Sequence, residues 1–378
     1  MRKLESSHRL RTPSKAHAHI MIESTIAGKL VLTRARERRA PKLLADIGGT
    51  HARFAVEVAP GIVEAIAVLP CASYGTPEQA MRDYLDSPAA RDAGADSIAE
   101  GALAIAGNVS GEQVQMTNHH WRFRPAAIRK EFGWHALTLC NDFSALALSL
   151  PRLDATEKRQ VGGGAPVENG AMAVLGPGTG FGVSGLVKTR EGWTPLETEG
   201  GHVNFAPANE TECRILEFAW REYPHVSVER LLSGIGLDIV YRALCEQAGA
   251  PCDAIDVPEI LRRGLARLCP VCSDTIDAFC AMLGTAAANV ALTLGASGGV
   301  YIGGGIVPRL GARFDTSGFR ARFEAKGRFS AYLAQIPTYL ITAEYPAFKG
   351  LSAKLAMAEY QYRQAVEREG ASEAEYAG

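Results

Sequence analysis

The chain lacks the long apolar runs that cross a membrane. Its longest candidate, residues 281–294, falls short of the roughly 18–20 residues that a span needs. It is also interrupted by Gly284, Thr285 and Asn289, so it predicts a buried helix. The net charge is also small, because 40 Lys and Arg residues nearly balance 41 Asp and Glu residues. The electrostatic footprint of a nucleic-acid or membrane-surface protein is therefore missing, and we expect neither nucleic acid nor a membrane as a partner.

Cysteine is sparse and scattered, with 8 residues in a chain of 378. Cys140, Cys245 and Cys280 lie inside apolar segments, as the reduced and packed thiols of a cytoplasmic protein do. The one C-x-x-C tract, at residues 269–272, has no further ligands at suitable spacing nearby, and a structural zinc site needs four. We therefore expect a cytoplasmic protein without structural zinc.

Two common nucleotide-binding signatures are also missing. The glycine-threonine tracts at residues 43–54 and 171–184 lack the Gly-Lys-Ser/Thr ending of a Walker loop. In each, the turn is followed by a strand and not by the helix of a dinucleotide fingerprint. Residues 43–54 instead run as strand, Gly48-Gly49-Thr50 turn and second strand, which predicts a tight β-hairpin. Glycines at such a turn let backbone N–H groups converge on an anion, and Asp46 would hold a metal-bound water beside it. The tract predicts a phosphate clamp.

A second tract of the same build strengthens this prediction. Residues 171–184 run as strand, Gly178-Thr179-Gly180 turn and strand. Two such hairpins indicate two related halves that face each other across a cleft, and the chain is long enough for two domains. We predict a small α/β domain at residues 43–152 plus about 343–366 and a large α/β domain at 153–342. Residues 1–42, which are basic and poor in acids, are expected to be a disordered extension.

Strands alternate with helices along the chain, which indicates an α/β architecture. Further strands are predicted at residues 61–69, 102–106, 113–117, 137–140, 300–302 and 339–341, and helices at 77–86, 125–132, 145–150 and 347–365. Residues 210–294 are mostly helical in pattern, and 160–170 form a glycine-rich loop. Asn141 or Asp142 can cap the helix that follows them.

Seven tracts together resemble those of bacterial-type glucokinases in the actin-like (ribonuclease H-like) superfamily of sugar kinases and heat-shock ATPases. In the family's order they are residues 45–50, 116–119, 141–143, 176–180, 199–202, 229–234 and 303–309. His51 and Asn108 stand where the family usually has asparagine and proline. The cysteine-rich zinc motif of the related repressor-and-kinase proteins is absent, which favours the glucokinase branch. The resemblance covers residues 43–357 and implies a two-domain fold with an interdomain cleft.

The resemblance implies ATP-dependent phosphorylation of D-glucose to glucose 6-phosphate, the first step of glycolysis. Asp142 is then the catalytic base, although position alone supports a helix cap equally well. The implied sugar ligands are Asn141, Glu199, His202 and Glu229. Without the family match, Glu229 is better interpreted as a surface helix residue and His202 equally as a structural histidine. Asn118 and Trp121 would border the sugar, with Trp121 better explained as core.

The resemblance also implies the nucleotide site. The residues expected to bind ATP are Ala45, Asp46, Ile47, Gly48, Gly49 and Thr50 from one domain and Gly178, Thr179, Gly303 and Gly304 from the other. The phosphates would contact the two glycine-threonine turns, and the adenosine would lie against Gly303 and Gly304. Asp46 would position Mg²⁺ through water, because magnesium sheds its hydration shell reluctantly. The family resemblance further implies a homodimer.

Other interpretations of the same tracts remain open. A kinase for fructose or mannose would use the same motifs, because these residues do not rank hexose epimers. A sugar-sensing transcriptional regulator would need a helix-turn-helix module, which residues 1–42 do not resemble. An actin- or chaperone-like ATPase would use the phosphate clamp without a sugar. The phosphoryl donor, whether ATP, ADP or polyphosphate, is likewise not fixed by the motifs.

Overall fold

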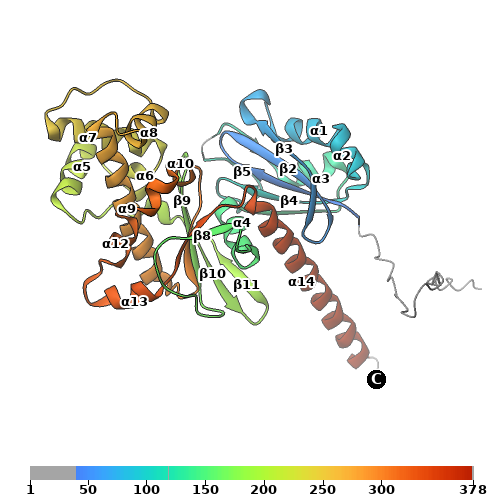
Figure 1. Cartoon of the computed structure of the whole chain (residues 1–378). Helices are drawn as coiled ribbons and strands as arrows, with labels where there is room; N and C mark the ends of the chain where they lie inside the picture. Colours follow the sequence, from blue (N-terminus) through green and yellow to red (C-terminus); the bar gives the residue numbers. More distant parts are fainter. Residues whose placement is uncertain (1–39, 118, 377–378) are drawn as a thin grey trace, which may run out of the picture. The chain divides into compact units, whose positions relative to one another are not determined.

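The computed structural model describes residues 40–117 and 119–376 (Figure 1). Most of the expected basic extension and the expected sugar neighbour Asn118 lie outside the described residues. The described chain contains two main β-sheets with helices packed on their faces. Short 3₁₀ turns complete it at η1 (Cys71–Ser73), η2 (Ala95–Ser97), η3 (Leu150–Arg152), η4 (Gly200–His202) and η5 (Gly327–Phe329).

The first sheet has the order β3-β2-β1-β4-β7. Its strands are β1 (Lys42–Ile47), β2 (His51–Ala59), β3 (Ile62–Pro70), β4 (Glu100–Ile105) and β7 (Ala136–Asn141). Strands β3, β2 and β1 are antiparallel neighbours, whereas β1, β4 and β7 are parallel. The first predicted hairpin is confirmed, because β1 and β2 pair across a turn that the Gly48 N–H closes by donating to the His51 carbonyl at 3.0 Å.

The second sheet has the order β11-β10-β9-β12-β13-β8. Its strands are β8 (Lys158–Gln160), β9 (Met172–Pro177), β10 (Phe181–Thr189), β11 (Gly192–Leu196), β12 (Gly299–Ile302) and β13 (Thr338–Ile341). The first five strands of this order repeat the first sheet's pattern of two antiparallel pairings followed by two parallel ones. The second hairpin and the prediction of two related halves are thereby confirmed.

Two of the three helices on one face of the first sheet, α1 (Pro77–Leu85) and α3 (Pro125–Phe132), were predicted, whereas the five-residue α2 (Pro88–Asp92) was not. All three share a core with this face of the sheet. A small ribbon of β5 (Val114–Gln115) and β6 (Arg122–Phe123) adjoins that core. Trp121 precedes this last strand and is 1% exposed, with its indole N–H donating to the Tyr74 carbonyl at 3.1 Å. The interpretation of Trp121 as a core residue is confirmed.

The predicted helical segment after residue 210 is also confirmed. It contains α5 (Glu210–Trp220), α6 (Val228–Leu231), α7 (Gly234–Ala248), α8 (Val257–Leu265) and α9 (Pro270–Leu294). Four further helices, α10 (Val307–Leu310), α11 (Ala312–Asp315), α12 (Phe319–Glu324) and α13 (Ser330–Gln335), were not predicted. Helices of four to six residues are too short to display a helical period in the sequence.

Helix α9 corrects the estimate of the longest apolar segment. The buried helix predicted at residues 281–294 begins at Pro270 and has 25 residues. The polar residues before position 281 do not interrupt it, because Asp274 and Asp277 reach solvent and the buried Thr275 donates its hydroxyl to the Val271 carbonyl at 2.7 Å. Among the described helices, α9 alone is long and apolar enough to cross a membrane by length and composition. Its apolar window is 67% buried inside the protein, as in the core helix of a folded domain.

Two helices lie between the sheets. Helix α4 (Asp142–Ser149) and helix α14 (Pro346–Tyr376) are seen near the centre of Figure 1. Phe348 and Leu351 of α14 cover the free face of the first sheet together with Ala145 of α4. Leu146 and Leu148 of α4 pack on the second sheet. Helix α4 therefore touches both sheets, directly after the strand end that carries Asp142.

Gly350 permits the close packing of α14 on α4. A Cβ atom at Gly350 would lie 1.7 Å from the Ala145 carbonyl oxygen. Replacing this glycine with alanine should lower the free energy of unfolding by about 1–3 kcal/mol, the usual cost of overpacking, because the clash outweighs the gain of up to about 1 kcal/mol in helix propensity. Urea denaturation measures the change. Gly163→Ala, whose Cβ meets nothing within 4 Å, is the control, and equal stability of the two variants would contradict this packing.

Candidate active site

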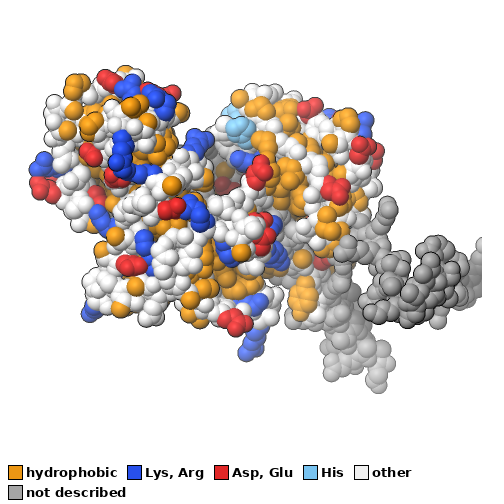
Figure 2. All heavy atoms as spheres, in the orientation of Figure 1, with side chains coloured by type: hydrophobic (Ala, Val, Ile, Leu, Met, Phe, Trp, Pro, Cys, Tyr) orange, Lys and Arg blue, Asp and Glu red, His pale blue; other side chains and the backbone are white. Residues whose placement is uncertain are grey.

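A cleft of about 300 Å³ lies between the carboxyl ends of β1 and β7 in one sheet and the β9–β10 turn of the other. Figure 2 shows the surface hollowed between these two parts of the molecule. The cleft brings together predicted residues from both halves of the sequence: Gly48, Gly49, Asn141, Asp142, Gly178, Thr179, Glu199, His202, Glu229 and Gly304. The sequence motifs therefore meet at one place.

Five predicted nucleotide-site residues do not line this cleft. Ala45 and Ile47 are fully buried in β1, so that only their backbone is available to a ligand. Gly303 is buried behind Gly304, and Thr50 is exposed at the hairpin turn. Asp46 is the last residue but one of β1, and its side chain is partly exposed. These positions support the cleft from behind or beside it.

Asn141 fixes the start of helix α4. Its side-chain oxygen accepts hydrogen bonds from the N–H groups of Phe143 at 2.9 Å and Ser144 at 3.3 Å. Its amide nitrogen donates to the Gly107 carbonyl at 3.3 Å. Of the two possible caps, Asn141 is therefore the one that caps α4, and Asp142 is its first residue. An amide nitrogen carries two hydrogens, so one remains for a ligand in the cleft.

Asp142 carries the most strongly perturbed carboxyl group in the cleft. Removal from water raises the pKa of Asp142 to about 7, and the neighbouring negative charge of Asp46 adds to the rise. A hydrogen bond from the Phe143 N–H, at 3.0 Å, opposes it. A carboxyl group with a near-neutral pKa is suited to take up and release a proton at physiological pH. The position of Asp142 in the sequence is equally consistent with a helix cap, but the residue that caps α4 is Asn141.

Arg53 is a cleft residue that sequence reasoning missed. Its guanidinium lies 3.1 Å from Oδ2 of Asp46, the residue directly opposite it in the β1–β2 register. Burial nevertheless raises the pKa of Asp46, against the lowering effect of Arg53. The register of the hairpin was the available signal, since residues facing each other across antiparallel strands are close enough to pair. Arg53 places a positive charge in a cleft otherwise rich in carboxylates.

Glu199, His202 and Glu229 form one side of the cleft. The His202 imidazole lies between the two carboxylates, with Nε2 3.9 Å from Glu199 Oε2 and Nδ1 3.8 Å from Glu229 Oε1. Glu229 also accepts a hydrogen bond from the Phe181 N–H at 2.7 Å. Glu229 is thus anchored to β10, which does not fit the alternative of an ordinary surface residue. Glycine is required at Gly201, where a Cβ would lie 2.0 Å from the Phe181 carbonyl oxygen.

The second glycine-threonine turn packs against Gly304. Gly304 has a positive φ of 79°, and a Cβ there would lie 2.3 Å from the Pro177 carbonyl oxygen. The Gly178 N–H donates to the Gly180 carbonyl at 2.8 Å, and the Gly178 carbonyl accepts from the Gly234 N–H at the start of α7. The two glycine tracts, more than a hundred residues apart in sequence, thus form one backbone surface without side chains.

Other residues of the cleft were not predicted either, and three of them contribute side chains that bear on its shape. Thr117 lines the cleft, Thr198 donates its hydroxyl to the Val183 carbonyl at 2.7 Å, and the Phe143 ring lies against Gly182. Thr117 lies inside a quoted motif and Thr198 directly precedes another. Their contribution depends on which way each side chain points, which the motif does not reveal.

The fold and this cleft define a class of protein: the two-domain, actin-like sugar kinases. A glucokinase structure from an Antarctic psychrotroph has a TM-score of 0.75 and 36% identity, covering 84% of this chain and 99% of its own. The predicted fold class is confirmed.

The glucokinase family profile matches residues 43–358, and the chain belongs to that family. A glucokinase of Chromobacterium violaceum is 53% identical over 316 residues, covering 84% of this chain and 89% of its own. A bifunctional protein of Burkholderia pseudomallei is 49% identical over 337 residues, or 88% of this chain, which spans only 51% of that protein. These relatives support the glucokinase prediction and not the alternatives.

The Glu229–Phe181 hydrogen bond generates a testable prediction. Phe181 is 5% exposed, so Glu229→Ala should leave a buried N–H without a partner and lower the free energy of unfolding by about 1–3 kcal/mol. Glu199→Ala is the matched control in the same cleft. The Glu199 side chain is 72% exposed, and its loss should change stability by no more than about 0.5 kcal/mol. Urea denaturation compares them, and equal effects would show that Glu229 is not an anchor.

Proposed function

We propose that this protein transfers the terminal phosphoryl group of ATP to the 6-hydroxyl of D-glucose, giving ADP and glucose 6-phosphate. The observation that supports this most strongly is the position of Asp142. Its carboxyl group lies in the same cleft as both glycine-threonine turns, so an alcohol beside Asp142 can point at a phosphate held by the turns. Alignment of this kind is the main requirement of phosphoryl transfer.

Asp142 would act as the general base. It would accept the proton of the 6-hydroxyl as that oxygen bonds to the γ-phosphorus and the bond to the β-phosphate oxygen breaks. The burial that raises the pKa of Asp142 to about 7 matches the group to this role, because a base works best with a pKa near the operating pH. The Asn141 cap and the Phe143 contact with Gly182 hold the carboxyl group in place.

The sugar would bind on the side formed by Asn141, Glu199, His202 and Glu229. These side chains offer an amide, two carboxylates and an imidazole to a ligand that consists largely of hydroxyl groups. A site built to hydrogen-bond each hydroxyl rejects a sugar that leaves one of its groups unpaired. Because Glu229 is already bonded to the Phe181 N–H through Oε2, its Oε1 is the oxygen directed toward His202 and the sugar.

The nucleotide would contact the glycine surface. Gly48, Gly49 and Thr50 would bind the phosphates from one half, Gly178 and Thr179 from the other, and Gly303 and Gly304 would lie against the adenosine. The absence of side chains at these turns permits the approach of a large ligand. The exposed Thr50 would reach the phosphates only from the rim of the cleft, and Ala45 and Ile47 would contribute backbone groups.

The carboxylates in and beside the cleft, Asp142 and Asp46, fit a magnesium ion carried by the nucleotide. Magnesium in kinases is held by one or two carboxylates together with phosphate oxygens and water. Arg53 binds Oδ2 of Asp46, so that Oδ1 of Asp46 would hold the ion through water. When bound, Mg²⁺ neutralises charge on the β- and γ-phosphates. Arg53 adds a positive charge from the protein itself.

We further propose that the two halves move as domains, one comprising residues 43–152 and about 343–366 and the other residues 153–342. Separate hydrophobic cores around each sheet support this division, with α4 and α14 between them. Closure of the cleft would exclude water and limit ATP hydrolysis. A homodimer in the cytoplasm completes the proposal and rests on the family resemblance alone.

Asp142→Asn tests the proposal. With Mg-ATP and a panel of glucose, mannose and fructose, the wild-type protein should release ADP fastest with glucose. The variant should lose about 10²–10⁴-fold in kcat, the usual contribution of a general base, while glucose binding measured by calorimetry changes little. Turnover near wild type would exclude Asp142 as the base, and ADP release independent of sugar would contradict the kinase assignment.

The raised pKa of Asp142 also predicts the stability of Asp142→Asn, which serves as a control that this variant is folded. A folded-state pKa of about 7, above the ordinary value of about 3.9, means that the folded protein holds this proton more tightly than the unfolded chain. Ionisation of Asp142 therefore destabilises the fold as the pH rises through this interval. Asp142→Asn removes the cost, so its melting temperature at about pH 8 should equal or exceed that of the wild type.

The same pKa predicts a pH profile. The base must be ionised to accept a proton, so kcat/KM for glucose should rise with pH and level off above a midpoint of about 7. Below the midpoint it should fall by about tenfold per pH unit. Initial rates from about pH 5.5 to about pH 9 measure the profile. A profile that is flat across this range would contradict the assignment, as would a midpoint near 4.

A further inference from the structure

Four cysteines gather at one end of the helical layer, away from the cleft. Cys245 lies near the end of α7, Cys252 in the loop to α8, and Cys269 and Cys272 at the start of α9. Cys245 and Cys272 belong to a small buried cluster with Tyr241, and Cys269 packs against it. The sequence around the C-x-x-C tract shows no other cysteine close by, but the packing of α7, α8 and α9 brings Cys245 into the same cluster.

Thiol chemistry fits this cluster better than metal binding. Among the described residues, no group of three or more His, Cys, Asp or Glu side chains is arranged to hold a metal ion. The pKa of each buried thiol is instead raised by burial and by a partner thiol, which is Cys252 for Cys245 and Cys269 for Cys272. All four are free thiols. Adjacent thiol pairs are the reactants of disulfide formation.

The Cys269–Cys272 pair has one accessible and one buried sulfur. Cys269 caps α9 and is partly exposed, whereas Cys272 lies in the first turn and is 0% exposed. The Ser273 N–H donates to the Cys269 carbonyl at 3.0 Å, which places both cysteines on one helical turn. Burial raises the pKa of Cys272 to about 12, so this thiol is protonated before the reaction begins and the first attack falls to the more accessible Cys269. An accessible attacking thiol next to a buried resolving thiol is typical of dithiol exchange sites.

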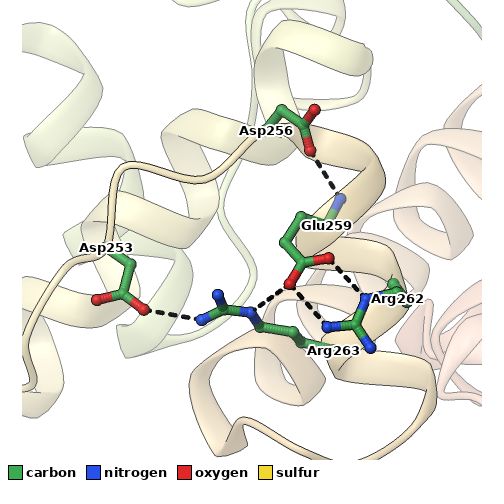
Figure 3. Close-up of polar contacts among 5 residues, drawn as sticks. All are labelled: Asp253, Asp256, Glu259, Arg262 and Arg263. Carbon is green, nitrogen blue, oxygen red and sulfur yellow. Dashed lines mark hydrogen bonds and ion pairs between the residues drawn. The ribbon is translucent and has the colours of Figure 1, made fainter.

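A network of ion pairs holds the surrounding backbone (Figure 3). Arg263 of α8 binds Asp253, next to Cys252, at 2.8 Å and Glu259 at 2.7 Å. Glu259 also binds Arg262. The backbone N–H of Glu259 donates to the side chain of Asp256, which caps α8, at 2.9 Å. The loop that carries Cys252 is thereby tied to α8.

Helix α8 is in turn packed tightly on α9. The Ser273 hydroxyl donates to the Gly264 carbonyl at 3.0 Å. A Cβ at Gly264 would lie 2.6 Å from the Cys272 carbonyl oxygen. The first turn of α9, which carries the C-x-x-C tract, is therefore positioned by its neighbours.

We propose that Cys269 and Cys272 form a thiol–disulfide exchange site that is oxidised by low-molecular-weight disulfides. The ionised sulfur of Cys269 attacks one sulfur of the disulfide, forms a mixed disulfide and releases the other half as a thiolate. Cys272 gives up its proton to solvent and attacks Cys269, which releases the second thiolate. Two protein thiols are oxidised and one disulfide is reduced to two thiols, so that electrons and atoms balance.

The pairing protects an accessible thiol. A single exposed cysteine keeps a mixed disulfide once it has formed, or is oxidised further to irreversible acids. A neighbouring thiol converts the same adduct into an internal disulfide that dithiol reductants reverse. The site is separate from the cleft, because Gly234 at the start of α7 contacts Gly178 and Cys245 lies eleven residues further along that helix, about 16 Å at 1.5 Å per residue.

Peptide mapping of the full chain tests the site without reference to kinase activity. The protein is incubated with oxidised glutathione, alkylated and digested, and each cysteine is assigned by mass. Cys213, an exposed cysteine on α5, is the comparison within the same molecule. It should retain glutathione, whereas Cys269 and Cys272 should be joined to each other and carry none.

Variants separate the two steps. In Cys272→Ser, Cys269 should retain glutathione to the same occupancy as Cys213, and Cys213→Ser should leave the internal disulfide unchanged. Circular dichroism checks the fold of Cys272→Ser, and the wild-type map decides the question if that variant unfolds. A stable glutathione adduct on Cys269 of the wild type would overturn the proposal. So would an unreacted Cys269 beside a modified Cys213, or stoichiometric zinc that protects these cysteines from alkylation.

Discussion

The carboxyl group of Asp142 is held out of water where strand β7 becomes helix α4, and the rest of the cleft depends on that junction. Asn141 caps the helix, which fixes the direction in which α4 leaves the first sheet. The next residue, Phe143, packs on Gly182 of the second sheet. One helix thus positions the candidate base and joins the two halves, so any change in how the halves meet also moves Asp142.

This arrangement is costly for the fold, and the proposed role of Asp142 as the base would account for the cost. Asp142 and Asp46 are two carboxyl groups close enough for the charge of one to raise the pKa of the other. Arg53 offsets part of this repulsion through its ion pair with Asp46. Evolution tolerates such unfavourable groups mainly at functional sites. A nucleotide that brings Mg²⁺ would add positive charge to a cleft that Asp142, Glu199 and Glu229 line with carboxyl groups.

The sequence predicted those parts of the fold that local patterns determine. Both glycine-threonine hairpins were predicted because apolar strands flank a turn that needs glycine, and the repeat of this pattern indicated the two related halves. The short helices α10–α13 escaped because four to six residues carry no recognisable period. Gly350 gave no local signal, since its role depends on α14 meeting α4 almost two hundred residues away in sequence.

The candidate site likewise contains residues that local sequence motifs identify and residues that only contacts between distant segments reveal. Residues such as Asp142 and Glu199 could be named because they lie in motifs that resemble those of a known family, and the cleft brings them together. Arg53 was missed because its meaning depends on the residue opposite it in the β1–β2 register. The four cysteines were missed as a group because only the packing of α7, α8 and α9 brings them together. Contacts between segments distant in sequence are what motif reading omits.

A crystal structure of the protein with glucose and a non-hydrolysable ATP analogue tests the central claim most directly. The account predicts an Asp142 carboxylate oxygen within about 2.6–3.2 Å of the glucose 6-oxygen, the distance at which a base takes a proton. It also predicts the γ-phosphate between the two glycine-threonine turns. A glucose whose 6-oxygen faces Glu199 or Glu229 instead, with Asp142 bonded only to protein, would contradict it.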